Sequence, residues 1–286
     1  MGIVINTNVP SIQAARALSS TRADLEQAME RLSSGKRING AKDDAAGMSV
    51  VTRMKAQISS LNQAVRNAND GISLVSTFDG AADEIEDILI RMRELATLVQ
   101  NGTYTESDDS NANLEFRALN SEITRIQEKT KFNGSLDVAS TGTQTYSFQV
   151  GFNGGDAVSI AFGSLNASTL ATVDLGSSTL DLAGGADKAA NIATASAAVT
   201  KLDVALSNLN VHRATAGAVI NRLEHTVSNL MNVVQRTEEA RSRIEDADFA
   251  AESAAMARAN VLVQAGSAML AQANQSPQYV LALLRG

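Results

Sequence analysis

The sequence predicts a mainly α-helical protein, a long antiparallel helical bundle or coiled coil built from both chain ends, with a small inserted β-hairpin region. Three observations lead to this fold class. Apolar residues recur in alternating steps of three and four along stretches near both ends. The chain's two prolines, Pro10 and Pro277, leave the sequence between them free of this helix breaker. A strict alternation of polar and apolar residues, typical of strands, appears near the centre.

The first long apolar stripe begins at Val51 and follows a heptad repeat. It changes phase near Phe78 and Gly80, where we expect a local change of supercoil. It stops at 101–111, a turn-rich stretch whose Asp and Ser residues can cap the next helix. Its positions are 51, 54, 58, 61, 65, 68, 72 and 75, followed by 82, 85, 89, 92, 96 and 99.

Two further stripes complete the predicted bundle. A shorter helix running back is predicted by Phe116, Leu119, Ile123 and Ile126. A second long stripe consists of Ala216, Ile220, Leu223, Val227, Leu230 and Val234. Stripes from opposite ends of the chain most simply bury each other in one bundle. At this point an ordinary intracellular coiled-coil protein remains an alternative.

The central residues predict β structure. Apolar and polar side chains alternate over 146–150 and again over 158–162, and Asn153-Gly154-Gly155-Asp156 lies between them. This pattern predicts a β-hairpin. Residues 164–185 are rich in Ser, Thr, Leu, Ala and Gly, and we expect further short strands and loops there.

The two ends carry apolar helical segments, 11–34 and 249–284. Each helix alone would be marginally stable in water, because nothing buries its apolar face. We therefore expect the two segments to pair with each other or to contact other copies of the chain. The candidate assembly residues are Leu18, Leu25, Leu32, Leu262, Leu270, Leu281 and Leu284.

The sequence contains no pattern that indicates catalysis. His212 and His225 lie outside any HExxH arrangement and are expected on helix faces, and there is neither a cysteine nor a phosphate-binding glycine motif. The acidic groups at 43–44 and 245–248 are expected on solvated helix faces or in salt links between subunits, rather than as acid–base pairs. We expect no enzyme activity, catalytic residue, cofactor or metal.

Charge and hydropathy exclude two classes of partner. The net charge of −7 and the pI near 5.0 argue against a nucleic-acid-binding surface. No apolar run is long enough to predict membrane insertion.

The first twenty residues lack the charged, apolar and small-residue parts of a secretory leader. These residues alone would predict a cytosolic protein.

Several motifs, taken together, resemble bacterial flagellin. They cover about the first 135 and the last 100 residues in the family's order, and the centre between Gly134 and Asp187 is short. The motifs are INTN at 5–8, RLSSGKRINGAKDDAAG at 31–47, RNANDGIS at 66–73, RMREL at 91–95, KFNG at 131–134, and SRIEDADFAAESA at 242–254 through to the final LLRG.

The resemblance implies a short flagellin without large outer domains. Residues 1–44 and 243–286 would form an inner terminal coiled-coil domain, and 45–242 a helical bundle domain with 135–186 as its variable β-hairpin and loop region. The implied function is a structural subunit that self-assembles into the flagellar filament for swimming motility. Within the same relatives the hook–filament junction protein is the alternative, and a receptor-like signalling bundle is a more distant one.

The resemblance also replaces the cytosolic expectation with secretion. Flagellins leave the cell through the flagellar type III export apparatus and reach the extracellular flagellum without a cleaved leader. The implied partners are other copies of the chain, an export chaperone, the filament cap and the hook-junction proteins. Neither nucleic acid nor membrane insertion is implied.

Two sets of site residues follow from the resemblance. The stretch 31–50 resembles the spoke between the inner coiled coil and the outer domain, an inert polar linker being the alternative. There Gly35 and Gly40 would let the backbone turn, and an intersubunit boundary would be faced by Lys36, Arg37, Lys42, Asp43 and Asp44. In some flagellins a Toll-like innate immune receptor reads a surface that matches Arg91, Leu95 and Glu115, although Ile90 departs from the polar residue often found there.

Overall fold

The computed structural model describes residues 7–134, 136–137, 144–162, 182 and 188–285, and the chain divides into two compact units. The first unit combines residues 1–58 with 235–286, and the second comprises 59–234. Helices α2 (Ala45–Gln100) and α5 (Lys188–Glu245) contribute to both units. The boundaries of the units therefore fall inside these helices, whereas the sequence placed the division at 44/45 and 242/243.

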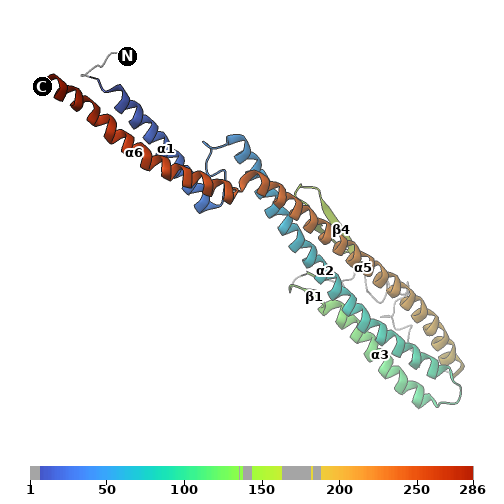
Figure 1. Ribbon diagram of the computed structural model, residues 1–286. Helices are drawn as coiled ribbons and strands as arrows, with labels where there is room; N and C mark the ends of the chain where they lie inside the picture. Colours follow the sequence, from blue (N-terminus) through green and yellow to red (C-terminus); the bar gives the residue numbers. More distant parts are fainter. Residues whose placement is uncertain (1–6, 135, 138–143, 163–181, 183–187, 286) are drawn as a thin grey trace. The chain divides into compact units, whose positions relative to one another are not determined.

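In the first unit, α1 (Val9–Ser34) lies alongside α6 (Phe249–Arg285) (Figure 1). Asn8 caps α1, since its side-chain oxygen accepts a hydrogen bond of 3.1 Å from the backbone N–H of Ser11. The amide nitrogen of the same side chain donates to the carbonyl of Ala273 in α6 at 2.7 Å. One residue thus satisfies the start of α1 and ties it to the helix from the other chain end.

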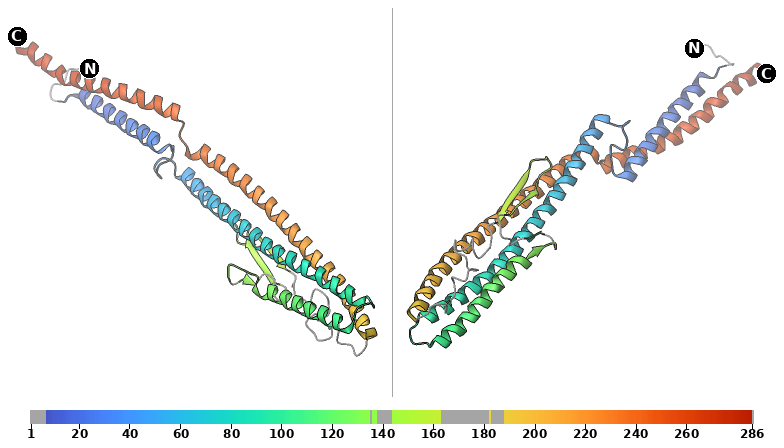
Figure 2. Two further views of the ribbon diagram at one scale, coloured as in Figure 1. Left: turned by 90° about the horizontal axis from the view of Figure 1, so that it is seen from below. Right: turned by 180° about the vertical axis from the view of Figure 1, so that it is seen from behind.

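The second unit is a bundle of α2, α3 (Glu106–Lys129) and α5 (Figure 2). Thr105 and Asp108 form a capping box at the start of α3: the N–H of Asp108 donates to the Thr105 hydroxyl, and the N–H of Thr105 donates to the Asp108 carboxylate. The expected cap by an Asp or Ser is therefore only partly right. The N-cap is Thr105, and the helix already begins inside the predicted turn.

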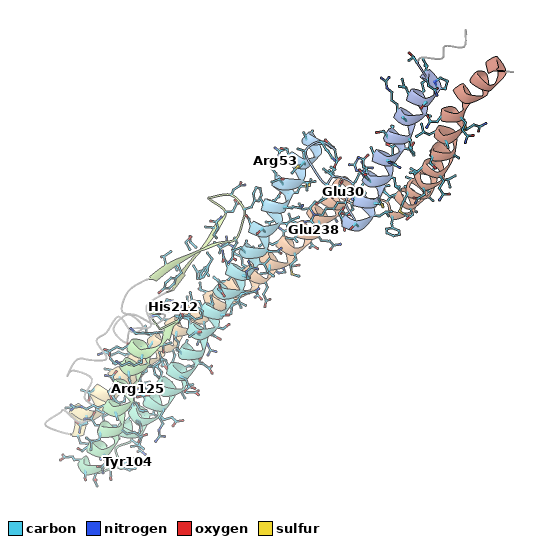
Figure 3. All side chains as sticks on the ribbon, turned by 90° about the vertical axis from the view of Figure 1, so that its left-hand side faces the viewer. Glu30, Arg53, Tyr104, Arg125, His212 and Glu238 are labelled. Carbon is cyan, nitrogen blue, oxygen red and sulfur yellow. The ribbon has the colours of Figure 1, made fainter. Side chains whose placement is uncertain are left out.

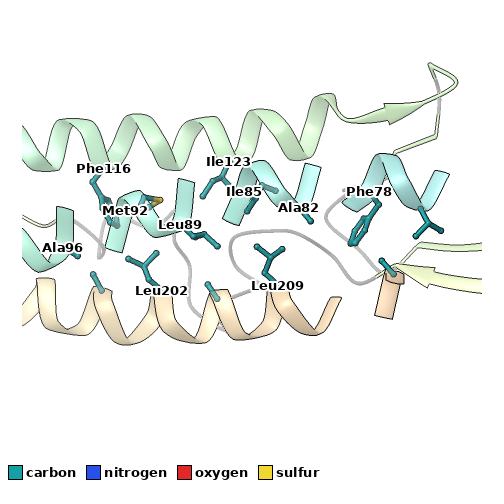
Figure 4. Packing of buried hydrophobic residues seen from close by; sticks show 14 of the residues in the cluster. Phe78, Ala82, Ile85, Leu89, Met92, Ala96, Phe116, Ile123, Leu202 and Leu209 are labelled. Atoms are coloured by element: carbon teal, nitrogen blue, oxygen red, sulfur yellow. The ribbon is translucent and has the colours of Figure 1, made fainter. Parts of the chain in front are cut away.

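Buried apolar side chains from all three helices form one core (Figure 4). Leu202 of α5 and Phe116 of α3 point toward α2 from opposite sides. Helix α2 continues without a break through the expected phase change, where Phe78 is 1% exposed and fills the core. The predicted helical bundle is confirmed.

The apolar stripe of α5 begins much earlier than the sequence analysis placed it. The helix starts at Lys188, whereas the predicted stripe began at Ala216. The missed residues have the same three-and-four spacing and are all buried, namely Ala195, Ala198, Leu202, Ala205 and Leu209. Because three of the five are alanines, the stripe is weak by hydrophobicity although its period is regular.

The predicted β-hairpin is confirmed. Strands β3 (Gln144–Gln149) and β4 (Ala157–Phe162) are antiparallel, with Tyr146 opposite Ile160. A second pair, β1 (Lys131–Phe132) with β2 (Leu136–Asp137), was not expected. The strands and loops predicted for 164–185 lie outside the described residues, apart from the buried Leu182.

Charged and ionisable groups of α5 contact α2 and the hairpin. The Arg213 guanidinium forms ion pairs with Asp79, Asp83 and Glu86, which occupy successive turns of α2. His212 is half-buried in a small cavity beside β4 (Figure 3), and burial lowers the pKa of its imidazole. His225 is exposed, as expected for a helix face.

Within the described part of the chain, no helix has the length and apolar character needed to cross a membrane.

Gly71 of α2 lies where the helix, the hairpin and α5 converge. A Cβ atom there would lie 3.3 Å from Leu223 Cδ1 and 3.4 Å from Phe148 Cγ, whereas a Cβ at Gly80 of the same helix would meet nothing within 4 Å. We expect Gly71→Leu to lower the free energy of unfolding by about 1–3 kcal/mol through overpacking. Gly80→Leu is the matched control and should leave it unchanged or raise it by up to about 1 kcal/mol.

Urea unfolding of both monomers, followed by circular dichroism, measures this difference. Equal stability of the two variants would contradict the close packing of the hairpin on α2.

Candidate functional site

A loop of residues 35–44, here called the junction loop, connects α1 to α2 and pairs with the connection between α5 and α6. The N–H of Arg37 donates to the carbonyl of Glu245 at 2.7 Å, and the N–H of Ala247 donates to the carbonyl of Gly35 at 3.0 Å. These bonds enclose an antiparallel bridge between Lys36 and Asp246. Backbone from the two ends of the chain is therefore joined directly, as in one rung of a β-ladder.

Gly35 and Gly40 have different roles in this loop. Gly35 ends α1 with φ of 69°, in the left-handed region, and its N–H donates to the carbonyl of Arg31 at 2.8 Å. This is a helix C-terminus that glycine adopts without strain. Gly40 has no positive φ, and a Cβ there would meet nothing within 4 Å. The expectation that glycine is needed at Gly40 for the turn is therefore wrong.

The carboxylate of Glu245, whose side chain is 5% exposed, lies at the centre of the junction. Lys55 Nζ lies 2.6 Å and Lys36 Nζ 3.1 Å from its Oε1, while Arg241 Nε lies 3.7 Å from Oε2. Burial raises the pKa of Glu245, but the hydrogen bonds from Lys55 and Lys36 outweigh it, so the pKa lies below its ordinary value. A buried carboxylate with these partners stays ionised and fixes three positively charged side chains.

The role of Glu245 was not expected from the sequence. The acidic group at 245–248 was expected on a solvated face or in a link between subunits, whereas Glu245 is buried and paired within its own chain. Lys55 lies 190 residues away in the sequence. No local pattern identifies such a pair, because it depends on how the two chain ends meet.

Asp43 and Asp44 each bind backbone N–H groups of the junction. Asp43 Oδ2 accepts hydrogen bonds of 3.1 Å from the N–H groups of both Asn39 and Gly40. These two bonds lower the pKa of the Asp43 carboxyl. Asp44 Oδ1 accepts a bond of 2.8 Å from the N–H of Gly47 and so caps the start of α2.

Gly47 is a further residue of the junction, and no motif in the sequence predicts its role. A Cβ atom at this position would collide with the Asp44 carboxylate and would lie 2.8 Å from Ile38 Cδ1. Ile38 is itself buried, at 8% exposure. Glycine is therefore required at position 47 for close approach, although not for an unusual φ.

The remaining predicted junction charges differ in their contacts. The Arg37 guanidinium donates to the carbonyl of Ile244 at 2.7 Å, and Lys36 is paired with Glu245. Lys42 is exposed and forms no ion pair among the described residues. Pairing across a subunit boundary stays a prediction for this group, most of whose members already have partners in their own chain.

The terminal helices bury only part of their apolar surface against each other. Leu18 is 8% exposed and packs over Gly266, where a Cβ would lie 3.3 Å from Leu18 Cδ1. Leu25, Leu32 and Leu270 are half-buried, whereas Leu262 is 50% exposed. For Leu281 and Leu284 only the backbone, in α6, is described. Other exposed apolar residues on these helices are Val9, Ile12, Met29, Phe249, Val261 and Met269.

The three candidate receptor contacts do not form one surface. Arg91 Nε and Glu115 Oε1 are 2.8 Å apart, and both side chains are exposed. Leu95 is 4% exposed and belongs to the core of the second unit. The prediction that Leu95 is a surface contact is therefore wrong. No group of His, Asp and Glu side chains suited to a metal ion occurs among the described residues.

Comparison with known proteins identifies relatives over nearly the whole chain. Residues 5–137 match the model of the bacterial flagellin N-terminal helical region, and residues 199–284 match that of the C-terminal helical region. A flagellin of Halalkalibacterium halodurans is 43% identical over 283 residues, covering 99% of this chain and 100% of the relative. A flagellin of Bacillus subtilis is 39% identical over 302 residues, covering 98% and 99%.

A solved structure described as a flagellar hook-associated protein from Vibrio parahaemolyticus has a TM-score of 0.58 to this chain. It covers 71% of this chain and 100% of that chain, with 15% sequence identity. This likeness is one of fold alone.

Alanine at three glycines separates their roles in the junction. Gly35→Ala should lower the stability of the junction by about 1 kcal/mol, because position 35 has a positive φ. Gly47→Ala should lower it by about 1 kcal/mol, because the new side chain displaces the Asp44 cap. Gly40→Ala is the matched control and should cost less than about 0.5 kcal/mol. Amide exchange at Arg37 and Ala247 measures the local stability. Equal exchange in all three variants would contradict the assigned roles.

Glu245→Gln keeps the size of the side chain and removes its charge. Because the pKa of Glu245 is lower in the folded chain than its ordinary 4.5, its ionic contacts stabilise the junction fully above that ordinary value. This contribution is lost as the pH falls through the lowered pKa that Glu245 has in the folded chain. We expect the protection factor of the Arg37 amide to drop about tenfold in the variant at neutral pH.

The difference in this protection factor between Glu245→Gln and wild type should then become smaller at acidic pH. Glu239→Gln, at an exposed position of α5, is the control and should match wild type at every pH. A difference between Glu245→Gln and wild type that does not depend on pH would contradict the role of the ionised carboxylate.

Proposed function

This chain belongs to the bacterial flagellin family and is a structural subunit of the flagellar filament used in motility, and we propose how its parts contribute to assembly. The observation that carries the function is 43% identity to a flagellin across 99% of the chain. A filament subunit polymerises with copies of itself. The hook–filament junction protein is not favoured, since the likeness to a hook-associated protein is limited to fold.

The exposed apolar side chains of α1 and α6 are the proposed assembly surface. Val261 and Met269 of α6 are 65% and 62% exposed, and Ile12 of α1 is 48% exposed. Burying a side chain of this kind contributes about 1.5–3 kcal/mol. In a single chain these residues remain in water, whereas neighbouring copies in a filament can cover them. The outward faces of the helix pair thus carry the assembly function.

The junction loop has a different proposed role, which is to hold the two terminal helices in one register. Its backbone bonds to Glu245 and Ala247 fix where α1 ends relative to where α6 begins. The ion pair between Arg31 Nη1 and Glu252 Oε1, at 2.8 Å, adds a further link between the same two helices. The loop would thus present the helix pair to neighbouring copies in a defined alignment.

We further propose that the chain reaches the extracellular flagellum through the flagellar type III export route. Its proposed partners on this route are an export chaperone, the hook-junction proteins and the filament cap. The exposed apolar faces of α1 and α6 support a chaperone, because such surface promotes unwanted association until a partner covers it. We propose a purely structural role for the subunit, without a catalytic residue, cofactor or metal.

A Toll-like immune receptor remains a proposed partner at the surface around Arg91 and Glu115. Both side chains are exposed and ion-paired with each other. Ile90, which is 44% exposed beside them, departs from the polar residue often found in receptor-binding flagellins. The buried Leu95 would act here only by holding α2 in the core.

Seeded polymerisation of purified subunits tests the assembly function. The double substitution Val261→Ser with Met269→Ser should leave the helical content of the monomer unchanged, because both side chains are exposed. It should slow elongation strongly, since the covered apolar area is lost. Gln264→Ser, at an exposed polar position of the same helix, is the matched control and should elongate at the wild-type rate.

Normal elongation by the double variant would contradict the proposed surface. A wild-type monomer that never added to flagellar seeds would contradict the filament function itself.

A further inference from the structure

Asparagine followed by glycine occurs four times in the chain, at 39–40, 101–102, 133–134 and 153–154. This dipeptide can modify itself without an enzyme. The glycine backbone nitrogen loses its proton to solvent and attacks the asparagine Cγ, forming a ring C–N bond. The side-chain nitrogen gains a proton and leaves as ammonia, and water then opens the succinimide to aspartate or isoaspartate. Glycine permits this attack because it has no Cβ to obstruct it.

In the junction loop both reacting groups of Asn39-Gly40 are held in hydrogen bonds. The attacking nitrogen, that of Gly40, donates its hydrogen to Asp43 Oδ2 at 3.1 Å, and the N–H of Asn39 donates to the same oxygen. The side-chain amide of Asn39 donates to the carbonyl of Lys36 at 3.3 Å. Both residues are half-buried. Attack on Cγ would require several of these bonds to break.

Asp43 is also poorly suited to promote the reaction. Its pKa is lowered because its carboxylate accepts the two backbone hydrogen bonds. A carboxylate of low pKa is a weak base. It therefore holds the Gly40 hydrogen in place and does not remove it.

The loop between α2 and α3 offers no such restraint to Asn101-Gly102. Both residues are exposed, near Tyr104 at the end of the bundle (Figure 3). The backbone N–H of Asn101 donates to the carbonyl of Leu98 at 3.0 Å. Neither the Asn101 side-chain amide nor the Gly102 N–H has a hydrogen bond within the described part of the chain. The Asn101-Gly102 pair therefore lacks the hydrogen bonds that hold the attacking nitrogen and the side-chain amide of Asn39-Gly40 in place.

We propose that Asn101-Gly102 is a site of spontaneous deamidation and that the Asp43 carboxylate protects Asn39-Gly40 from the same reaction. The protection matters for the geometry of the junction. Isoaspartate at position 39 would add a methylene group to the main chain of the loop that aligns Gly35 and Arg37 with α5 and α6. The exposed loop at 101 has no comparable long-range backbone pairing among the described residues.

The test follows both sites on the same molecules of the full-length chain. Purified protein is aged at mildly alkaline pH and digested, and the deamidated fraction of each peptide is measured by mass spectrometry. The rate at each site is divided by its rate in denaturant. In wild type we expect this relative rate to be about tenfold or more lower at Asn39 than at Asn101, the factor that one charge-assisted hydrogen bond provides.

Two substitutions separate the protecting carboxylate from general loosening of the junction. Asp43→Ala should raise the relative rate at Asn39 to that at Asn101. Asp44→Ala removes the neighbouring carboxylate, which caps α2 without binding Asn39 or Gly40, and should leave Asn39 protected. Adding Gly40→Ala to Asp43→Ala should suppress the reaction again, because a side chain at the attacking residue obstructs it.

Three results would overturn the proposal. They are equal relative rates at Asn39 and Asn101 in folded wild type, no acceleration in Asp43→Ala, and an equal acceleration in Asp44→Ala. Only the protecting role of Asp43 predicts acceleration by one aspartate substitution and not by its neighbour.

Discussion

Pairing between segments from opposite ends of the chain is the constraint on which the rest of the structure depends. Helix α1 packs on α6, the junction loop bonds to the connection after α5, and α2 packs on α5 in the core of the bundle. None of these helices buries an apolar face by itself, and a long amphipathic helix without a partner is marginally stable in water. Each unit therefore forms only when segments from both halves of the sequence are brought together.

The buried Glu245 carboxylate specifies how the two ends meet. Desolvating a carboxylate is unfavourable, and removing a partner from a buried ion pair is strongly destabilising because the remaining charge is left uncompensated. Here one carboxylate contacts Lys36 of the junction loop and Lys55 of α2. A shift in register by one residue would move these contacts apart and leave the buried charge uncompensated. The geometry therefore selects one alignment of the chain ends.

Local periodicity accounts for the parts of the fold that could be predicted. The heptad stripe of α2 and the alternation around Asn153 depend on neighbours in the sequence, and both the bundle and the hairpin are confirmed. The first half of α5 was missed because its buried stripe consists mostly of alanine. Alanine is only weakly hydrophobic, so these positions do not stand out from the surface positions of the helix.

The junction could be located from the sequence but not explained by it. The positive φ of Gly35 agrees with the expectation, whereas Gly40 has no positive φ and open space where a Cβ would lie, and Gly47 was not expected to matter. The role of Gly47 depends on contact with Asp44 and Ile38, and that of Glu245 on residues far away in the sequence. Contacts of this kind appear only when the chain ends have been brought together.

A disulfide between positions 36 and 246 tests most directly whether this alignment of the chain ends belongs to the assembling subunit. The chain has no cysteine, and Lys36 and Asp246 face each other between two backbone hydrogen bonds. Such antiparallel pairs have Cα atoms about 4.5 Å apart, within disulfide range. We predict that Lys36→Cys with Asp246→Cys oxidises readily in the free monomer, and that the oxidised monomer elongates flagellar seeds as fast as the reduced one. Failure to form the disulfide, or elongation by the reduced form alone, would contradict a junction closed within one chain.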